Sequence, residues 1–370
     1  MSFKDELKSY ALEIGIDDLK VTSAQPFFKL KRFMQKLKKK NYLSKFVKDD
    51  LDLITNPKKV LEDAKSVIVC AISYKIDDKY IDLNQKGLRG KLSRFALGKD
   101  YHQVLGNKLE KLANCLREEG FRAVKFVDTG PTVDRALAKR AGIGWQGKNC
   151  SIIHPQYGSW IFIGGLISDL DLESDGSIES NCGECRRCIE SCPTGALKAD
   201  YTLDSRKCLG YISLSKGYIA AEYRKKLRTR LWGCDSCQEV CPANKEAKSG
   251  NHPHFKPEDL APYPYLPPLL KLSNKEYKEK FGSTAMNWRG KRPIQRNAAI
   301  IMGNLNDKIA IPHLLDGLED PKPIVRAHSA WALAEIGDKS VKSKLKLLLK
   351  KERDKEVKKE YEFAVEKLMG

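Results

Sequence analysis

Cysteine is the residue type whose spacing in this chain points most directly to chemistry. Eight of the eleven cysteines fall into two runs, and both runs end in Cys-Pro. The first run has the spacing C-x₂-C-x₂-C-x₃-C-P, in which the fourth cysteine binds the other of two 4Fe–4S clusters. This exchange of last ligands predicts cluster 1 at Cys182, Cys185, Cys188 and Cys241, and cluster 2 at Cys192, Cys208, Cys234 and Cys237. The chain is therefore predicted to be a redox protein.

Two other uses of these cysteines fit the sequence less well. Paired C-x₂-C elements also bind zinc, but a zinc site has no use for a third cysteine two residues further on. A disulfide framework needs a secretory context, and the first residues, Met-Ser-Phe-Lys-Asp-Glu-Leu-Lys, contain no apolar signal core. In the second run Cys208 stands apart from its partners, so the stretch between them must be an insertion that folds back.

Bulk composition limits the compartment and the partners. The chain has 370 residues, 41% of them hydrophobic, which suffices for two or three domains. No apolar run approaches the roughly 20 residues of a membrane span. The lack of a targeting segment and the odd number of cysteines predict a reducing cytoplasm, with a monomer as the default. A net charge of +19 favours a polyanionic partner, although a solvated basic surface would also account for it.

The pattern of apolar residues predicts a mixed helix and strand domain over residues 1–175. Strands are expected at 66–74 and 121–127, and two further strands at 151–154 and 159–167 are expected to be joined by a polar turn. Helices are expected to begin near Phe3, Asp100 and Pro131. The continuous apolar character of 66–74 predicts a strand covered on both faces.

Three segments follow this domain. A cluster-binding domain is predicted over 176–250, and a linker rich in proline and aromatic residues over 251–291. Helices expected at 292–305 and 325–337 superimpose in sequence, with a shorter helix at 310–318 between them. This repetition is typical of HEAT-like solenoids, so a helical repeat domain is predicted over 292–370. Two helix pairs are too few for a free array, and we expect them to pack on the rest of the protein.

Over essentially its full length the chain resembles the epoxyqueuosine reductase family. The resemblance is carried by the blocks Arg94-Phe-Ala-Leu-Gly-Lys-Asp-Tyr-His102, Val127-Asp-Thr-Gly-Pro131 and Ala141-Gly-Ile-Gly-Trp-Gln-Gly-Lys-Asn149, together with the cysteine runs and the repeat tail. It implies an α+β fold with a nitroreductase-like cobalamin-binding α/β domain, a double-cubane ferredoxin-like domain and C-terminal α-helical HEAT-like repeats. It also implies two 4Fe–4S clusters and cobalamin as cofactors, tRNA as substrate, and two-electron removal of the epoxide oxygen from epoxyqueuosine at the wobble position.

The resemblance favours Asp128 as the general acid of this reaction. Asp128 follows a predicted strand at an edge where α/β folds place ligands, and an apolar corrin beside it would raise the pKa of its carboxyl. On the residues alone, a turn aspartate that binds backbone amides is the simpler interpretation. Asp134 is expected to be solvated. His102 is expected at a helix start, and the resemblance implies cobalamin held without a histidine ligand.

Several residues near these blocks are candidates for cobalamin contact. Lys148 and Asn149 are placed to reach the corrin amides or the nucleotide tail, although a plain turn is nearly as good an interpretation. Ile152 and Ile163 could pack on a corrin face or belong to the core. Leu209 follows the cluster ligand Cys208, where cluster and corrin must approach each other.

Basic residues interleaved with aromatic ones suit phosphate contact and base stacking. Two such groups occur, one inside the cluster-binding domain and one leading into the solenoid, whereas the lysine run 344–351 is interpreted as a solvated face. The candidate tRNA contacts are Lys216, Lys225, Lys226, Arg289, Lys291, Arg292 and Arg296.

Two other functions remain open at this point. A cobalamin-dependent reductive dehalogenase of small organohalides would share the first two domains, but this chain has no twin-arginine export signal and carries a basic surface that such an enzyme does not need. A plain electron carrier would explain the cysteines alone. For the epoxyqueuosine-reducing enzyme and for these alternatives alike, an unidentified low-potential donor must supply the electrons.

Overall fold

The computed structural model describes residues 2–80, 86–199, 201–257 and 260–369. The chain forms two compact units. Unit 1 comprises Met1–Asp77, Lys99–Cys208 and Ser236–Lys256, and unit 2 comprises Asp78–Gly98, Leu209–Asp235 and Pro257–Gly370. Among the described residues no helix combines the length and the apolar character that a membrane crossing requires.

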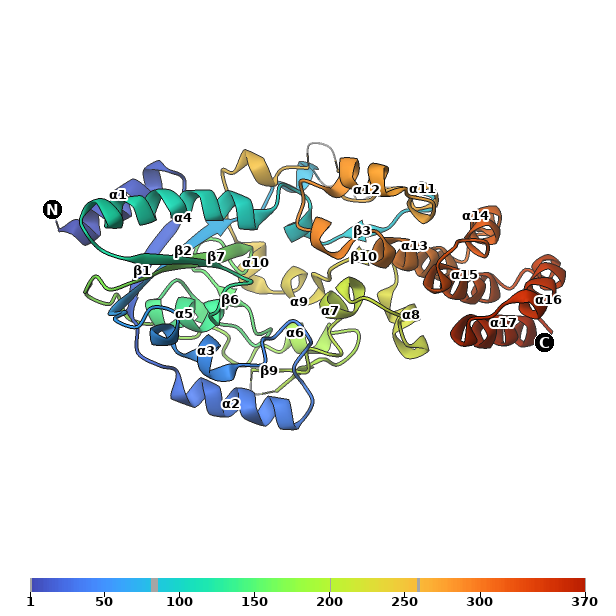
Figure 1. Ribbon diagram of the computed structural model, residues 1–370, viewed down its shortest axis with the longest axis horizontal. Coiled ribbons are helices and arrows are strands. Elements are labelled where there is room, and N and C mark those ends of the chain that lie inside the picture. Colours follow the sequence, from blue (N-terminus) through green and yellow to red (C-terminus); the bar gives the residue numbers. More distant parts are fainter. Residues whose placement is uncertain (1, 81–85, 200, 258–259, 370) are drawn as a thin grey trace. The chain divides into compact units, whose positions relative to one another are not determined.

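The centre of unit 1 is a four-stranded antiparallel sheet (Figure 1). Its strands, in the order β1-β2-β7-β4, are β1 (Asp18–Ser23), β2 (Ser66–Ser73), β7 (Ile161–Ser168) and β4 (Ala123–Val127). The predictions for β2, β4 and β7 are confirmed, whereas β1 has no counterpart among the predicted strands. Every residue of β2 is buried, as expected for a strand covered on both faces.

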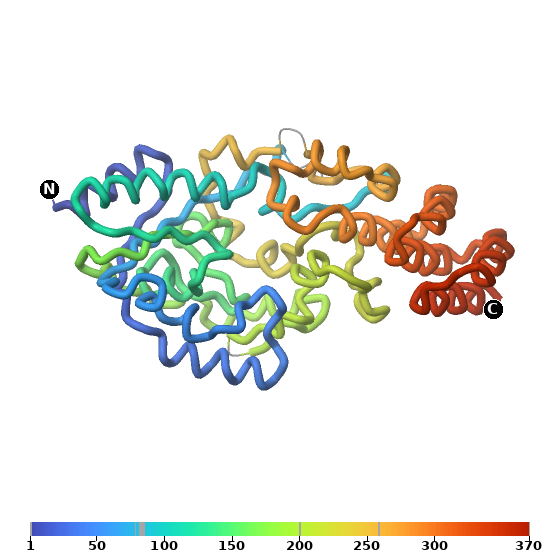
Figure 2. Tube along the Cα trace, viewed as in Figure 1, coloured from blue at the N-terminus to red at the C-terminus, as the bar shows by residue number. Residues whose placement is uncertain are grey.

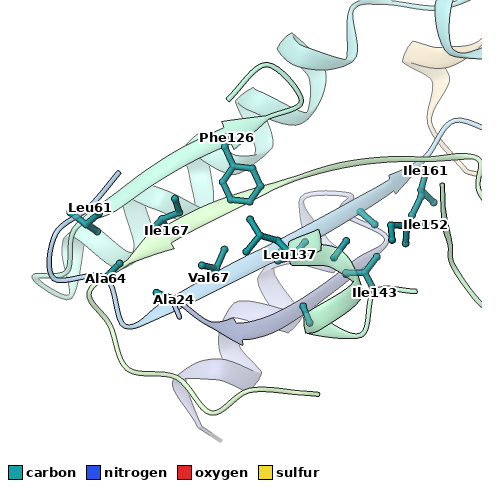
Figure 3. Close-up of a cluster of buried hydrophobic side chains, with 14 residues drawn as sticks. Ala24, Leu61, Ala64, Val67, Phe126, Leu137, Ile143, Ile152, Ile161 and Ile167 are labelled. Carbon is teal, nitrogen blue, oxygen red and sulfur yellow. The ribbon is translucent and has the colours of Figure 1, made fainter. Parts of the chain in front are cut away.

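Helices cover both faces of this sheet. The helices α1 (Phe3–Glu13) and α4 (Tyr101–Glu118) lie along one face, and α5 (Asp134–Ala141) packs against β1 and β2 on the other. Side chains from the sheet and α5 form one hydrophobic cluster, which includes Val67, Phe126 and Leu137 (Figure 3). Gly165 allows this packing, because a Cβ there would stand 2.1 Å from the carbonyl oxygen of Ile68.

A second layer of unit 1 consists of α2 (Phe28–Lys39) and α3 (Leu51–Thr55). Met34 of α2 packs against Leu51 and Ile54 of α3 in a small separate cluster. The cysteine-bearing part of unit 1 has only short elements. They are α6 (Arg187–Glu190), β8 (Leu197–Lys198), β9 (Thr202–Leu203), α9 (Ser236–Glu239) and α10 (Pro242–Lys245), and the short pair β5 (Trp145–Gln146) and β6 (Ile152–Ile153) lies upstream of them.

Unit 2 is mainly helical, and its helical repeats form the C-terminal part of the chain (Figure 2). The segment between Cys208 and Cys234 folds as α7 (Leu209–Leu214), α8 (Ala221–Leu227) and β10 (Arg230–Trp232), and β10 pairs in parallel with β3 (Lys91–Leu92). The remaining helices are α11 (Pro267–Leu270), α12 (Asn274–Phe281), α13 (Arg292–Leu305), α14 (Ile311–Gly317), α15 (Pro323–Ile336), α16 (Lys342–Lys351) and α17 (Lys355–Lys367). Single 3-10 turns lie at Pro57–Lys59, Asp78–Tyr80, Arg94–Ala96, Pro253–Phe255, Asn287–Arg289, Lys308–Ala310 and Lys339–Val341.

The repeat helices match the sequence pattern closely. Both α13 and α15 end at a residue with left-handed backbone, Asn306 with φ 54° and Gly337 with φ 75°. The repeat helices were expected to pack on the rest of the protein because two helix pairs are too few to stand alone. Accordingly, α13 packs on α8 and β10 of the same unit. The stretch 251–291, expected as a linker, contains α11 and α12 and contributes Leu269 and Phe281 to the buried interior.

One local expectation is corrected, and another is confirmed with a different strand pairing. The helix expected to begin at Pro131 begins at Asp134, because Thr132 and the backbone of Asp128 use the Asp134 carboxylate to close the preceding loop. The strands β6 and β7 and the polar turn between them are confirmed, and an antiparallel bridge between His154 and Gly158 closes the turn, although the two strands do not pair with each other. The strand β6 pairs with β5, while β7 joins the main sheet.

Candidate functional site

Asp128 lies immediately after β4, where the chain leaves the sheet. Its backbone is left-handed, with φ 48°, which is a costly conformation for a residue with a Cβ and is typical of functional loops. Its carboxylate is 62% exposed. Asp128 was expected at a ligand-binding edge because α/β folds with parallel sheets bind ligands at the ends of their strands. This sheet, however, is antiparallel. The position of Asp128 is therefore set by the strained turn and not by a topological switch point.

Tyr101 and His102, at the start of α4, face Asp128. The Tyr101 hydroxyl donates a short hydrogen bond to Asp128 Oδ2, and His102 Nε2 lies 3.8 Å from the same oxygen. Burial and the negative charge of Asp128 raise the pKa of Tyr101 well above its usual value, so this hydroxyl keeps its proton. The ring of Tyr101 is held by Phe162 of β7, with a centroid distance of 4.1 Å and an interplanar angle of 5°.

His102 is oriented by the residue that caps its helix. Asp100 Oδ1 lies 2.8 Å from His102 Nδ1 and also accepts a hydrogen bond from the His102 backbone N–H. Burial opposes the charged ring, but the hydrogen bond and the charge of Asp100 outweigh it and raise the pKa of His102. This contact agrees with the expectation that His102 starts a helix, and it leaves Nε2 directed toward Asp128.

Asp134 corrects the expectation of a solvated side chain. Its Oδ2 accepts a hydrogen bond of 2.6 Å from the backbone N–H of Asp128, and its Oδ1 accepts one of 2.5 Å from the Thr132 hydroxyl. Burial raises the pKa of Asp134 to about 7, and the nearby charge of Asp128 acts in the same direction. Asp134 thus closes the loop that displays Asp128.

The four cysteines predicted for cluster 1 lie together in unit 1. Burial raises the pKa of Cys188, and its thiol also feels the charges of Cys182, Cys241 and Cys185. The helices α6 and α9 bring the two runs together, and the Ser191 hydroxyl donates to the Ser236 carbonyl. In the described part of the chain no three His, Cys, Asp or Glu side chains are grouped as the ligands of one metal ion. The predicted donors are cysteine sulfurs throughout, and iron–sulfur ligation would use them as thiolates.

Cys192, Cys208 and Cys237, predicted for cluster 2, belong to unit 1, whereas Cys234 belongs to unit 2. The Cys192 thiol accepts backbone hydrogen bonds from Leu197, Thr194 and Ala196, which outweigh its burial and lower its pKa. Amide donors around a ligating sulfur favour the thiolate that a cluster needs.

Cys150 lies near predicted ligands of both clusters, and the sequence left the role of this cysteine undecided. Burial raises the pKa of Cys150 to about 11, and its thiol also feels Cys188 of the first set and Cys208 of the second. Its Sγ lies 3.2 Å from the carbonyl oxygen of Tyr201, and its backbone is left-handed, with φ 62°. A raised pKa keeps this thiol neutral and unreactive.

Asn149 is the predicted cobalamin contact whose environment fits a ligand best. Its side chain is 6% exposed, and its Oδ1 accepts a hydrogen bond from the Ser151 backbone N–H. Its Nδ2 is buried without a hydrogen-bond partner among the described residues. A buried amide donor of this kind is costly unless a ligand completes it. Lys148, the preceding residue, is half-buried, and its Nζ donates to the Gly183 carbonyl at 2.5 Å.

The other predicted cobalamin contacts are more deeply placed. Ile152 is a member of the hydrophobic cluster under the sheet, and the partly buried Ile163 packs against that cluster. Both residues therefore have a role in the core of unit 1. Leu209 is buried at the start of α7 in unit 2.

All the predicted tRNA contacts belong to unit 2. Lys216 and Lys226 are exposed, and Lys226 lies over the ring of Tyr223. Lys225 forms an ion pair of 2.8 Å with Glu335. Together with Arg228 it lines a pocket of about 370 Å³, which is completed by Thr229, Gly303, Asn304, Leu305 and Asn306.

The basic residues that precede or begin α13 differ in the contacts that their side chains make. Trp288 is 56% exposed, and the guanidinium of Arg289 lies 3.9 Å from the centre of its ring. Lys291 donates to the Leu272 carbonyl, and Arg292 forms an ion pair of 3.2 Å with Asp320. Arg289 with Trp288 is therefore the pair best suited to a stacked, cationic RNA contact.

Arg296 is corrected as an RNA contact. Its side chain is fully buried, and its guanidinium donates to the backbone carbonyls of Ile212, Ser213, Ser215 and Gly217. A guanidinium in this position cannot reach a phosphate. Its role is to fasten α7 and the residues directly after it onto α13. From sequence, a basic residue in a basic stretch looks like surface, and only the fold reveals the cluster of carbonyls.

Comparison with known proteins identifies families for three parts of the chain. Residues 55–129 match the family described as epoxyqueuosine reductase QueG, residues 181–244 match a 4Fe-4S double cluster binding domain, and residues 289–366 match HEAT repeats. The double-cluster match confirms the two-cluster interpretation, and the last match confirms the predicted repeats.

Relatives match along the whole length. A Bacillus anthracis protein named epoxyqueuosine reductase is 41% identical over 358 residues, which are 96% of this chain and 94% of that protein. An epoxyqueuosine reductase solved with an epoxyqueuosine-modified stem loop of tRNA-Tyr is 39% identical, with a TM-score of 0.95 and 99% of each chain covered. A Bacillus subtilis structure, with an aspartate-bearing catalytic loop swung out of its active site, is 39% identical with a TM-score of 0.93, covering 99% of this chain and 98% of that one. The chain belongs to the epoxyqueuosine reductase family.

Proposed function

We propose that this protein reduces epoxyqueuosine to queuosine at the wobble position of tRNA. The observation that carries the proposal is the identity of about 40% to epoxyqueuosine reductases over nearly the whole chain. That likeness favours this reaction over the dehalogenase alternative, and a tRNA substrate would place the enzyme in the cytoplasm. The reaction converts an epoxide into an alkene, so it consumes two electrons and two protons and releases one molecule of water.

Asp128 is the proposed proton donor to the departing oxygen. Its carboxyl is displayed at the end of β4, with the Tyr101 hydroxyl and His102 Nε2 beside one of its oxygens. Tyr101 donates to Asp128 and so fixes the orientation of the carboxyl, while the other oxygen remains available. The Asp128 side chain is 62% exposed, and a bound nucleoside would exclude solvent from it and strengthen the donation.

The cysteines would hold the iron–sulfur clusters, and a separate group of residues would hold cobalamin. The two cysteine sets would ligate 4Fe–4S clusters, which accept and pass one electron at a time. Cobalamin, when bound, supplies a metal centre reducing enough to deliver electrons to the epoxide. Asn149 would donate its unpartnered Nδ2 to a corrin amide, Lys148 would lie beside it, and Ile152, Ile163 and Leu209 remain proposed packing residues.

The basic residues of unit 2 are proposed to bind the tRNA backbone and loop. Arg289 stacked on Trp288 suits an unpaired base or a phosphate, and Lys216, Lys225 and Lys226 suit phosphates. Lys291 and Arg292 would contribute charge near the same segment. A base in an anticodon loop is already unpaired, so presenting it to a pocket costs only a few kcal/mol.

The proposal is tested by turnover on the nucleoside itself. Protein reconstituted without air with iron, sulfide and cobalamin is incubated with an epoxyqueuosine-containing stem loop and a chemical reductant, and a parallel reaction contains an organohalide. Mass spectrometry of the digested nucleosides should reveal queuosine in the first reaction. Organohalide reduction without queuosine would overturn the proposal in favour of the dehalogenase.

A further inference from the structure

We infer that the exposed face of α2 and the loop after it form the docking surface for the electron donor, a small acidic electron-carrier protein. This surface, called the α2 face, comprises Lys29, Arg32, Phe33, Lys36, Lys39, Lys40, Lys45, Phe46 and Lys48. The inference rests on the proposed function, because it supplies the reductant that the two predicted clusters need.

The charge of this segment is extreme. Residues 28–48 contain nine lysine or arginine residues and no aspartate or glutamate. Two of these cations are used internally, since Lys31 pairs with Asp52 at 2.6 Å and Lys38 pairs with Asp49 at 3.1 Å. Among the residues that the structure describes, the cations of the α2 face have no acidic partner. Such a concentration of one sign steers an oppositely charged protein and speeds its association.

The geometry of α2 separates a packing face from a docking face. Leu30, Met34 and Leu37 follow helical spacing on the inner side, where Met34 packs against Leu51 and Ile54 of α3. Lys29, Arg32 and Lys36 follow the same spacing on the outer side and are exposed. A helix that binds a lipid surface needs a free apolar stripe. Here that stripe packs on α3, and the exposed apolar residues of α2 are Phe28 and Phe33.

The α2 face is connected directly to a predicted cluster ligand. The carbonyl oxygen of Tyr42 accepts hydrogen bonds from the backbone N–H of Ser205 at 2.9 Å and from its hydroxyl at 2.6 Å, and the Ser44 N–H donates to the Ser205 hydroxyl at 2.7 Å. Three residues later stands Cys208, whose N–H donates to the Ser205 carbonyl. A carrier docked on α2 would thus meet the part of unit 1 that contains the predicted cluster 2 ligand Cys208.

The chemistry of the surface favours a carrier protein over RNA. Lysine supplies most of its charge, and lysine acts as a mobile point charge suited to a transient encounter. Electron-transfer complexes are small and weak, and electrostatic attraction dominates their association. Phe33 and Phe46, 38% and 40% exposed, supply apolar contact among the cations. The stacked arginine and tryptophan chemistry that suits RNA lies instead at Trp288 and Arg289 of unit 2.

The proposed step is a one-electron transfer. A flavin hydroquinone in the carrier is oxidised to the semiquinone, and one 4Fe–4S cluster is reduced by the same electron. Two such transfers, with two protons from the enzyme and water, account for one epoxide reduced to an alkene and one water released.

The test compares two ways of reducing the clusters. The variant Lys29→Glu/Lys36→Glu/Lys40→Glu is compared with a control of equal charge change on α16, Lys346→Glu/Lys350→Glu/Lys351→Glu, whose lysines are also exposed. Stopped-flow absorbance follows cluster reduction in the cluster-loaded protein by a flavodoxin hydroquinone and, separately, by dithionite. This readout does not require turnover of tRNA, so failure of the proposed function leaves it intact.

We expect the α2 variant to lose at least about tenfold in the second-order rate with flavodoxin at low salt, and to retain the dithionite rate. The α16 control should change both rates little. Equal losses in the two variants would overturn the proposal, because they would reflect net charge alone. Weaker binding of the stem loop to the α2 variant, with an unchanged flavodoxin rate, would assign the surface to RNA and also overturn it.

Discussion

At the scale of single residues, the proposed chemistry depends on one displayed carboxylate. Asp128 sits on a left-handed backbone with Tyr101 and His102 beside it, and these three residues come from two segments more than twenty positions apart. Two features of the sequence indicated Asp128. It lies in the block 127–131 that resembles the epoxyqueuosine reductase family, and it follows a predicted strand. It did not indicate the contact with Tyr101, because nothing in the pattern of either segment places the start of α4 against the end of β4.

Replacement of Asp128 by Asn tests its role as the acid. The amide is nearly isosteric but carries no transferable proton, so turnover should fall at least about 100-fold while cluster absorbance and cobalamin binding persist. Thr129→Ala, a change at the exposed next residue, serves as the matched control and should remain active. Undiminished queuosine formation by Asp128→Asn would remove Asp128 from the proton pathway.

Asp134 is expected to act as a positioning residue for Asp128. Its carboxylate holds the Asp128 N–H, with Thr132 as a second donor and Arg135 as a nearby positive charge. Because its pKa is raised to about 7, lowering the pH through this value protonates it and weakens the hold on the loop. The rate should therefore decline on the acid side of pH 7, and Asp134→Asn, which never ionises, should lose that decline along with part of its rate. A pH–rate profile of the variant that keeps the same acid limb would contradict this role.

Asn149 provides a binding test independent of turnover. Asn149→Asp keeps the acceptor for the Ser151 N–H but removes the unpartnered donor Nδ2. Cobalamin affinity, followed by the change in its absorbance on titration, should fall about tenfold, as expected for one lost hydrogen bond in a buried site. Asn149→Ala, which loses both groups, should bind no better, and an unchanged affinity in both variants would place the cofactor elsewhere.

At the scale of elements, α13 shows how a basic sequence can hide a structural role. Arg296 fastens α13 to α7 and the residues directly after it through four backbone carbonyls. Arg296→Met should reduce the free energy of unfolding by about 3 kcal/mol or more, because the buried carbonyls lose their donors. Arg292→Met, which removes a half-buried ion pair, should cost about 1 kcal/mol or less in the same chemical denaturation experiment. Equal effects of the two changes would contradict the assigned role of Arg296.

The turn before α13 is where we expect RNA contact. Arg289→Glu should weaken stem-loop binding and reduce the slope of log affinity against log salt by about 1, the loss of one phosphate contact. Lys346→Glu on α16 supplies the control, since that exposed helix face is expected to be solvated. If the two variants bind the stem loop with the same affinity and salt dependence, Arg289 does not belong to the interface.

At the scale of the whole molecule, the sequence predicted the types of structure better than their boundaries. The buried strand β2 and the repeat helices α13 and α15 were clear because an apolar pattern runs through each of them. The strand β1 was missed because Leu19 and Val21 alternate with polar residues over too short a span to stand out. The start of α5 was misplaced because Pro131 suits a first helical turn, whereas tertiary bonds from Asp134 decided it.

The division of the chain also depends on contacts that no local pattern contains. Residues 78–98 and 209–235 join the C-terminal helices in unit 2, although each is flanked in sequence by parts of unit 1. The double-cluster domain was nevertheless predictable, because cysteine spacing records the chemistry of a cofactor directly, while the assignment of each cysteine to one cluster remains a prediction. The predicted domain limits of 175, 250 and 291 remain predictions.

The most direct test of the central claim is a single turnover without air, using protein loaded with both clusters and cobalamin and an epoxyqueuosine stem loop in excess. The account predicts that the modified nucleoside loses one oxygen atom, that two electrons are consumed for each queuosine formed, and that Asp128→Asn abolishes the conversion while keeping its cofactors. Fully loaded wild-type protein that leaves the epoxide intact, or a variant that converts it as fast as the wild type, would contradict the account.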